Sequence, residues 1–294
     1  MKVGIVILNY KNFAETIDCL ESVLKQKDVS LEIVVVDNCS GNNSVKELIS
    51  WKANKGDIGR NICILEASKN VGFARGNNIG IRYLLKKNID FIIVSNSDIA
   101  YSDDYTIKAI VDSYQSGIGV ITPTIYNLNG LPEMRTQYKR KLFPIRVYRH
   151  LLRIQNYKKL QYNTSSAKNG NTVKSKYQAL TDGVLKDYYS LTGCYFALTP
   201  DYLRVFPFLF PGTFLYGEEI ATLLLTYKAK LLTSLVKTEP IIHKQAASTD
   251  KTLKDGTERK MEMMAQSARE IRKIVFMNNK TIVQKYNRGS YVGD

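Results

Sequence analysis

The sequence lacks most features of a membrane-spanning, secreted or metal-cluster protein. No run of eighteen or more apolar residues is free of charge, proline and glycine, so no stretch suits a spanning helix. The apolar segment after Lys2 is too short and too soon polar for a signal peptide. The four cysteines follow no metal-binding spacing and fit small core residues, which indicates a reducing compartment. We therefore expect a cytoplasmic protein.

Acidic residues are also scarce. The 27 Asp and Glu stand against 42 Lys and Arg, a net charge of +15, and no acidic residue falls between Met134 and Thr181. Such an excess favours an anionic partner, which is a nucleic acid, a nucleotide or a membrane surface. With 294 residues, 44% of them apolar, and 7 prolines, the chain can bury a large core as one domain or slightly more.

Strand and helix patterns alternate through the first hundred residues. Apolar runs predict strands over 3–8, 31–36, 62–65 and 91–94, and helical spacing lies between them. This predicts an α/β fold with a mostly parallel central sheet and helices on both faces. Because ligands bind beyond the carboxyl ends of such strands, we expect Asn9, Asp37, the loop after Asn70 and Asp98 to line one rim.

The strand over 91–94 leads into Asn96, Ser97 and Asp98. Their oxygen atoms suit a hard cation such as Mg²⁺ or Mn²⁺, and that cation in turn suits a diphosphate. The alternative is a helix N-cap, because Asn, Ser and Asp are also the preferred capping residues. These three residues alone leave both interpretations open.

Two further segments suggest a nucleotide site. Asp37 ends the second strand, where an acidic residue can hydrogen-bond a ribose or a base, although an aspartate in a turn looks the same. The segment from Asn70 to Gly80 opens a helix with glycine and asparagine, a natural place for a phosphate. It is not the G-x-G-x-x-G fingerprint of dinucleotide enzymes, which disfavours hydride chemistry.

The chain resembles the family-two inverting glycosyltransferases of the GT-A fold, and within them the bacterial rhamnosyltransferase-like branch. The matching motifs cover about the first hundred residues and are Val6–Tyr10, Val35–Asn38 with Ser40, Asn70–Ile81 and Asn96–Asp98. The resemblance implies that Asp98 binds the Mg²⁺ or Mn²⁺ held by the donor diphosphate. It also implies that Asp37 contacts the base or ribose, and that the backbone of Asn9 and Tyr10 lies against the base.

The same resemblance implies a wider nucleotide-sugar site. Many members have an arginine directly before the asparagine of the third motif, whereas here Asn77 stands in that place and Arg75 comes two residues earlier. The remaining residues that we assign to the nucleotide sugar are Asn38, Gly72, Arg75, Asn77, Asn78, Asn96 and Ser97.

A basic stretch with interleaved aromatic and aliphatic side chains runs from Tyr138 to Lys159. Its near-helical spacing is typical of an amphipathic helix at an anionic membrane surface, where each Lys or Arg contributes about 1 kcal/mol. A solvated insert and an RNA-binding patch are the alternatives. The cationic residues of the stretch are Lys139, Arg140, Lys141, Arg146, Arg149, Arg153, Lys158 and Lys159.

The second half contains adjacent carboxylates and a histidine motif. Glu218 and Glu219 follow an aromatic run and suit the first turn of a helix. The family resemblance instead implies that Glu219, in place of the usual aspartate, is the general base, with Glu218 orienting the acceptor. His243 follows an apolar pair, and the resemblance implies that it completes the metal site or lies against the diphosphate.

We therefore interpret the chain as a metal-dependent inverting glycosyltransferase of surface polysaccharide synthesis, peripheral at the inner face of the cytoplasmic membrane. The resemblance implies that its donor is dTDP-rhamnose or a UDP-hexose and that its acceptor is a lipid-linked glycan. A non-catalytic sugar-nucleotide-binding protein and an RNA-binding or other polyanion-binding protein are the alternatives. The C-terminal tail packs on the core, forms a homodimer or lies on the membrane. The expected parts are a nucleotide-sugar half (1–125), a basic insert (126–186), an acceptor and catalytic half (187–250) and a helical tail (251–294).

Overall fold

The structure is a computed structural model, and it describes most of the chain. The described residues are 2–133, 137–138, 143–156, 183–184, 188–189, 191–244 and 256–287. Parts of the basic stretch, including Lys139, Arg140, Lys141, Lys158 and Lys159, lie outside them.

The first half forms the parallel part of the sheet, as the sequence predicts. The strands β1 (Lys2–Asn9), β2 (Ser30–Asp37), β3 (Ile62–Glu66) and β4 (Ile92–Asn96) lie in the order β3-β2-β1-β4. Alternate apolar side chains of these strands face opposite layers. The helices α1 (Phe13–Val23) and α2 (Ser44–Ala53) pack with Ile5 and Ile7, whereas α3 (Phe73–Lys86) packs with Val6 and Val34. A 3-10 helix, η1 (Gly56–Asn61), precedes β3.

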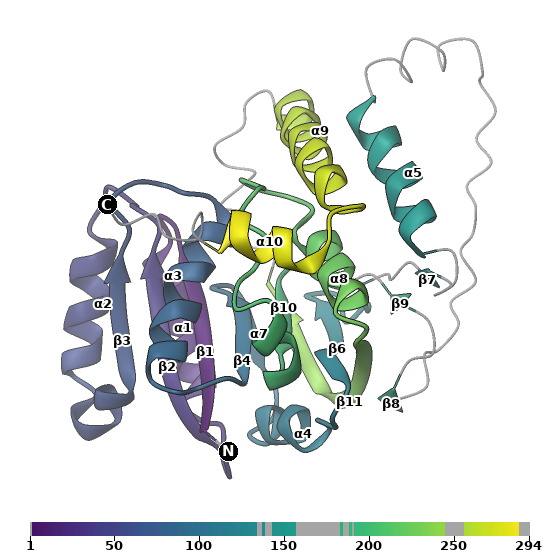
Figure 1. Cartoon of the computed structure of the whole chain (residues 1–294). Helices are drawn as coiled ribbons and strands as arrows, with labels where there is room; N and C mark the ends of the chain where they lie inside the picture. The colour runs from purple at the N-terminus through teal and green to yellow at the C-terminus, as the bar shows by residue number, and fades with distance from the viewer. Residues whose placement is uncertain are drawn as a thin grey trace.

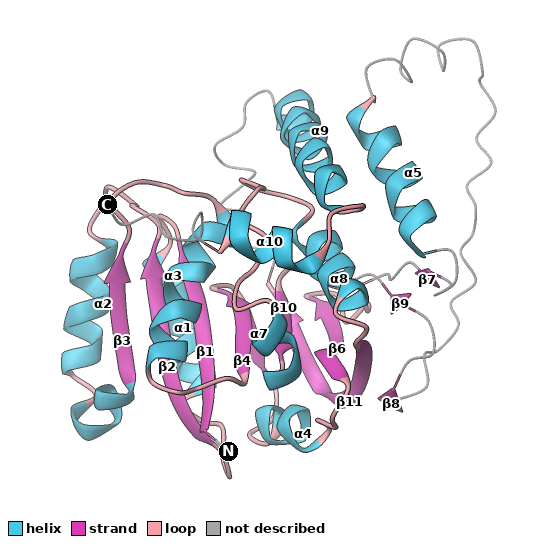
Figure 2. Cartoon of the chain, viewed as in Figure 1, coloured by secondary structure: helices cyan, strands magenta, loops and turns pink. Residues whose placement is uncertain are grey.

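The second half extends the same sheet. The strands β10 (Tyr195–Leu198), β6 (Ile118–Asn127), β11 (Leu232–His243) and β5 (Ile99–Tyr101) continue the order β4-β10-β6-β11-β5. Figure 2 labels β10, β6 and β11 beyond β4. β10 runs antiparallel to β4 and β6, and β5 runs antiparallel to β11. The short strand β8 (Gly183–Val184) also pairs with β11, and β7 (Gln137–Tyr138) pairs with β9 (Tyr188–Tyr189). Strands from both halves thus share one mostly parallel sheet.

Two expected elements are shorter than the sequence indicates. The sequence pattern after Asp98 predicts a helix over 102–116, but α4 spans Thr106–Asp112, because 99–101 pair with β11 and the backbone N–H of Ser102 bonds the carbonyl of Pro240. The apolar and aromatic run over 187–198 predicts one strand, but it divides into β9 and β10, since residues 191–194 form a loop. This loop proves important because it lies beside the candidate site.

The C-terminal helices cover the sheet. They are α7 (Pro200–Val205), α8 (Glu218–Lys228), α9 (Gly256–Ile274) and α10 (Asn279–Tyr286). The sequence predicts an apolar face of this tail made of Met261, Met263, Met264, Ile271, Ile274 and Val275. Ile271, Ile274 and Val275 are buried, together with Ala268, whereas the three methionines are half-buried. The helical tail therefore packs on the core, which was one of the three interpretations of the sequence.

The helix α5 (Phe143–Gln155) lies alongside α9 at the edge of the molecule (Figure 1). Phe143, Val147 and Leu151 recur along one buried face of α5, and the ring of Tyr148 contacts that of Phe276. Within the described ranges, no helix is both long and apolar enough to span a bilayer.

Candidate active site

The carboxyl ends of β1 and β2 are joined by a buried polar network. Asn9 and Asp37 are register partners, and the side-chain amide of Asn9 donates to the Asp37 carboxylate at 2.7 Å. The Thr16 hydroxyl donates to the side-chain oxygen (Oδ1) of Asn9, and the backbone N–H of Ser40 donates to the carboxylate of Asp37. Asn9 and Asp37 are 0% and 1% exposed, so their side chains fix the loop that follows β2. Tyr10 is half-buried at the same rim.

Asn38 ties this loop to the third motif. Its side chain donates to Asn70 and to the carbonyl of Gly72, and accepts from the backbone N–H of Val71. Gly72 has φ +84° and directly faces the backbone of Phe214, whose carbonyl oxygen would lie 2.3 Å from a Cβ at position 72. Any other residue at position 72 would therefore displace the segment that leads to Glu218.

The first turns of α3 hold the same segment. Arg75 donates from Nε to the carbonyl of Pro211 at 2.8 Å, and Asn78 both donates to and accepts from the backbone of Leu209. Asn77 is fully buried and donates to the carbonyl of Phe73. Arg75 and Asn78 therefore help to position the 209–214 segment, and the predicted contact of Asn77 and Asn78 with the nucleotide sugar stays a prediction.

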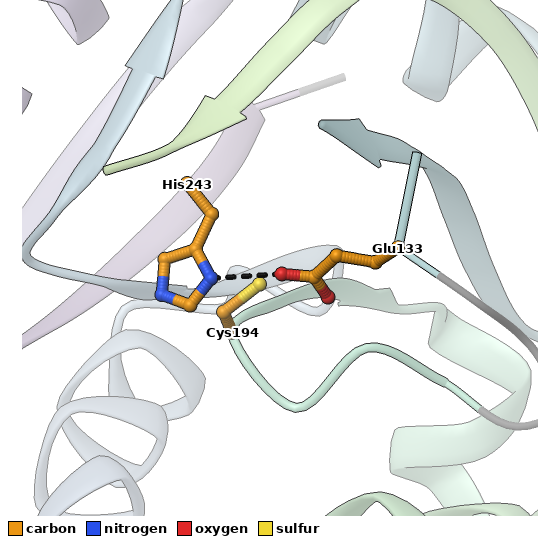
Figure 3. Close-up of side chains that lie close together, drawn as sticks. All are labelled: Glu133, Cys194 and His243. Atoms are coloured by element: carbon orange, nitrogen blue, oxygen red, sulfur yellow. Dashed lines mark hydrogen bonds and ion pairs between the residues drawn. The ribbon is translucent and has the colours of Figure 1, made fainter. Parts of the chain in front are cut away.

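Asp98 and His243 meet where β4 leads into β5. His243 pairs with Ile99 in the sheet, which brings Nε2 of its ring to 3.3 Å from Oδ1 of Asp98. Nδ1 of the same ring lies 2.9 Å from a carboxylate oxygen of Glu133 (Figure 3). Burial lowers the pKa of His243, but contacts with Asp98, Cys194 and Glu133 outweigh it and raise that pKa to about 12.

This arrangement fits a divalent cation. Oδ1 of Asp98 is buried, and the ring of His243 lies 3.3 Å from it. A cation bound between the two would replace the proton on Nε2 of His243, because a ligating histidine is neutral. Two ligands at about 2.1 Å on adjacent corners of an octahedron stand about 3 Å apart, close to the separation of Asp98 Oδ1 and His243 Nε2. Glu133 would then orient the ring from behind, as carboxylates commonly do for ligating histidines.

Cys194 completes a group with Glu133 and His243, whose ligand atoms lie within 4.8 Å of one another. Burial raises the pKa of Cys194 more than the nearby His243 lowers it, so the sulfur is held as a neutral thiol. A neutral thiol is a poor partner for a hard cation, which favours Asp98 and His243 as the ligands. Asn96 and Ser97 are half-buried beside them, and the backbone N–H of Asn96 bonds the carbonyl of Cys194.

Glu218 and Glu219 open α8, where the free N–H groups of the first turn favour negative charge. Burial, and then the neighbouring Glu219 carboxylate, raise the pKa of Glu218 to about 7. Burial also raises the pKa of Glu219. Oε1 of Glu218 and the hydroxyl of Thr213 are buried without hydrogen-bond partners among the described residues. The pair is thus a site where protonation and ligand binding can be coupled.

Glu219 is more accessible than Glu218 and faces the loop after β9. A Cβ at Gly193 would lie 3.5 Å from Oε2 of Glu219, and the next residue, Cys194, belongs to the group around His243. The 192–194 loop therefore connects the two clusters of functional residues. Glycine at 193 leaves open space next to the carboxylate of Glu219.

The structure adds residues that the sequence did not indicate. Glu133 is the last acidic residue before the stretch without acidic residues, and only this position in the sequence could have drawn attention to it. Cys194 gave none, because it reaches His243 through contacts distant in sequence, and Thr213, five residues before Glu218, belongs to no motif. Arg75 was expected at the nucleotide, and its partner Pro211 lies 136 residues away.

Comparison with known proteins agrees with this geometry. The Glycosyl transferase family 2 profile matches residues 4–172. The low-salt glycan biosynthesis hexosyltransferase Agl10 of Haloferax volcanii is 30% identical over 131 residues, covering 44% of this chain. This chain spans 38% of the length of that relative.

Solved structures with low identity share the fold. The mannosyltransferase PcManGT from Pyrobaculum calidifontis, in complex with GDP-Man and Mn²⁺, aligns with a TM-score of 0.53 at 10% identity, covering 98% of this chain and 73% of that one. S. aureus TarS 1-349 in complex with UDP-GlcNAc aligns with a TM-score of 0.52 at 13% identity, covering 97% and 76%. The α/β architecture is that of the GT-A glycosyltransferases. Since the profile matches more than half of the residues, the chain belongs to glycosyl transferase family 2.

Proposed function

We propose that this protein transfers a sugar from a nucleoside-diphosphate sugar to a hydroxyl group of a glycan acceptor, with inversion at the anomeric carbon. The observation that carries the proposal is the placement of Glu219 and of the Asp98–His243 pair around one loop, residues 192–194. A general base and a diphosphate-binding group must stand close together for such a displacement.

The reaction assigns each group a single task. The acceptor oxygen attacks the anomeric carbon, Glu219 takes the hydroxyl proton, and the bond to the diphosphate breaks as the nucleoside diphosphate leaves. Asp98 and His243 would hold a divalent cation, which when bound neutralises charge developing on the diphosphate. Burial raises the affinity of Glu219 for the proton, and Glu218, next to it in the first turn of α8, would orient the acceptor.

A hexose is the transferred group that the similarities favour. The Haloferax relative is named a hexosyltransferase, and the two solved structures contain UDP-GlcNAc and GDP-Man. The motif resemblance favours dTDP-rhamnose or a UDP-hexose. A thermal-shift screen of UDP-, dTDP- and GDP-sugars with Mg²⁺ or Mn²⁺, followed by mass spectrometry of products, tests this choice. Absence of both stabilisation and product across the panel would overturn the proposal.

Replacement of the base tests the mechanism. Glu219→Gln should lower kcat about 10²- to 10⁴-fold, because the amide cannot accept the proton, while the Kd for the donor stays unchanged. The matched control is Glu239→Gln, on an exposed carboxylate of β11, which should leave kcat unchanged. Normal turnover in Glu219→Gln would exclude this residue as the base.

We propose further that the basic insert holds the enzyme at a membrane carrying a lipid-linked acceptor. On α5, Arg146, Arg149 and Arg153 are exposed, and so is Ile145, which is 54% exposed. The opposite face of the helix packs against the core, so the charges point outward. Three cations beside an apolar side chain suit the interface of an anionic leaflet.

Vesicle co-sedimentation tests this attachment. The protein should pellet with anionic but not neutral vesicles at 0.1 M salt and detach at 1 M, because the Debye length falls from about 10 Å to about 3 Å. Replacing Arg146, Arg149 and Arg153 by Ser should release it. Replacing Lys46, Arg60 and Lys69 by Ser removes the same charge at the far end of the sheet and should not. Equal loss in both variants would point to net charge alone.

A further inference from the structure

A groove of 590 Å³ lies between α9 and the segment 212–214. This volume is within the range of about 300–1,000 Å³ that is common for ligand sites. One wall of the groove is a single face of α9, whose lining residues recur at intervals of three and four positions. The lining includes Phe214, Arg259, Glu262, Gln266, Arg269 and Glu270.

The floor of the groove is the segment that leads into the catalytic carboxylates. Phe214 stands four residues before Glu218 in the sequence. On its other side this segment touches the donor motifs, since the backbone N–H of Phe73 donates to the carbonyl of Phe214 at 2.8 Å. The hydroxyl of Ser267 on α9 donates to the carbonyl of Leu215 at 3.0 Å. The segment thus contacts the start of α3 and α9 at once.

The lining of the groove is electrically balanced, in contrast to the chain as a whole. Arg259, Arg269, Glu262 and Glu270 all line it from α9, with Glu270 also paired to Lys273, although the chain has a net charge of +15. A site for a phosphate or a nucleotide would carry an excess of cations. Guanidinium and carboxylate groups of equal and opposite charge, with an amide beside them, instead suit a neutral ligand that offers both hydrogen-bond donors and acceptors.

Phe214 supplies the apolar surface of the groove. Its side chain is 48% exposed although large aromatic groups are usually buried. A half-exposed ring beside polar groups offers a flat surface for the C–H face of a pyranose, while the hydroxyl groups point to the polar wall. Gln266 is exposed on that wall and offers both an amide donor and an acceptor.

We infer that this groove binds the uncharged terminal sugar of the acceptor glycan, an inference that rests on the proposed transferase function. Phe214 stacks on the sugar ring, and Gln266 with the Arg and Glu side chains of α9 binds its hydroxyl groups. The bound sugar lies against the segment that ends at Glu218 and Glu219. α9 therefore determines acceptor specificity, separately from the donor motifs at the start of the chain.

Saturation-transfer NMR on the full chain, with Mg²⁺ and a nucleoside diphosphate, tests this inference. The probes are the methyl glycosides of glucose, galactose, mannose, N-acetylglucosamine and rhamnose, with glucose 1-phosphate as the charged arm. At least one glycoside should bind, and Phe214→Ala and Gln266→Ala should each raise its Kd about tenfold. Gln284→Ala, an exposed glutamine on α10 outside the groove, should leave it unchanged.

Three results would overturn the inference, given that thermal melting confirms that the variants fold. They are binding of none of the glycosides, binding that both substitutions leave unchanged, and binding of glucose 1-phosphate alone, which would identify a phosphate site. Slow hydrolysis of the activated sugar without acceptor is measured in parallel. Hydrolysis without glycoside binding defeats only this inference, whereas glycoside binding without donor binding or hydrolysis defeats the proposed transferase function.

Discussion

The donor motifs and the catalytic motifs differ in how their buried polar groups are satisfied. On the donor side, Asn9, Asp37 and Asn38 bond one another or the neighbouring loops. On the catalytic side, Oδ1 of Asp98 has the ring of His243 at 3.3 Å, and Oε1 of Glu218 is buried without a hydrogen bond to the described residues. A buried polar atom without a partner costs about 1–3 kcal/mol, and Glu218 carries such a cost whereas Asn9, Asp37 and Asn38 do not.

This difference separates scaffold from reactive groups. The donor motifs make a loop framework whose backbone is fixed before any ligand arrives. The catalytic groups are held near that framework with unsatisfied bonding capacity, as expected where a cation, an acceptor hydroxyl or a proton will complete it. Polar residues of the donor motifs therefore hold the loops in place, whereas those of the catalytic motifs are left available for a ligand or a proton, although both kinds look alike in the sequence.

The largest effect is expected where the scaffold touches the catalytic segment. Gly72→Ala should lower the free energy of unfolding by about 4 kcal/mol, from positive φ and from the clash with Phe214. Gly41→Ala is the control, since Gly41 has φ +65° but nothing within 4 Å of a Cβ, and should cost about 1 kcal/mol. Urea unfolding measures both, and equal losses would show that the contact with Phe214 contributes nothing.

A somewhat smaller effect is expected from the buried charge of Glu218. Its pKa of about 7 in the folded protein exceeds the ordinary 4.5, so the folded state holds the proton more tightly. Stability should therefore be greatest below pH 4.5 as far as this group is concerned, and fall by about 3 kcal/mol between pH 4.5 and 7.

Glu218→Gln isolates this contribution. The variant should lose that part of the pH dependence of unfolding, and its stability should exceed that of the wild type at pH 8. Chemical denaturation at pH 5 and pH 8 measures the difference. Parallel pH profiles for the two proteins would contradict the assignment of a raised pKa to Glu218.

The smallest effect is expected behind the cation site. Glu133→Gln should weaken the metal-dependent tightening of nucleoside diphosphate binding about 10- to 100-fold, because the amide orients His243 less firmly. Calorimetry with Mg²⁺ and with EDTA measures it. Glu66→Gln, at the exposed end of β3, serves as the control and should change nothing. Equal behaviour of the two variants would show that Glu133 does not support the cation site.

Much of this organisation could be predicted from the sequence. The apolar runs placed β1 to β4 correctly. The close approach of Asp98 and His243, by contrast, follows from the pairing of β11 with β5. The helix expected over 102–116 was too long because β5 depends on pairing with residues more than a hundred positions away. Glu133 and Cys194 escaped notice for the same reason, since each depends on long-range contacts.

The position of α9 has a consequence for how such an enzyme diversifies. The family profile ends at residue 172, and α9 begins at Gly256, so the wall of the groove lies in a part of the chain that the shared profile does not constrain. On the proposal that the groove binds the acceptor, mutations there would change acceptor selectivity while the donor motifs are inherited unchanged. One chain would then carry two selectivities that evolve separately, on the two sides of the short segment before Glu218.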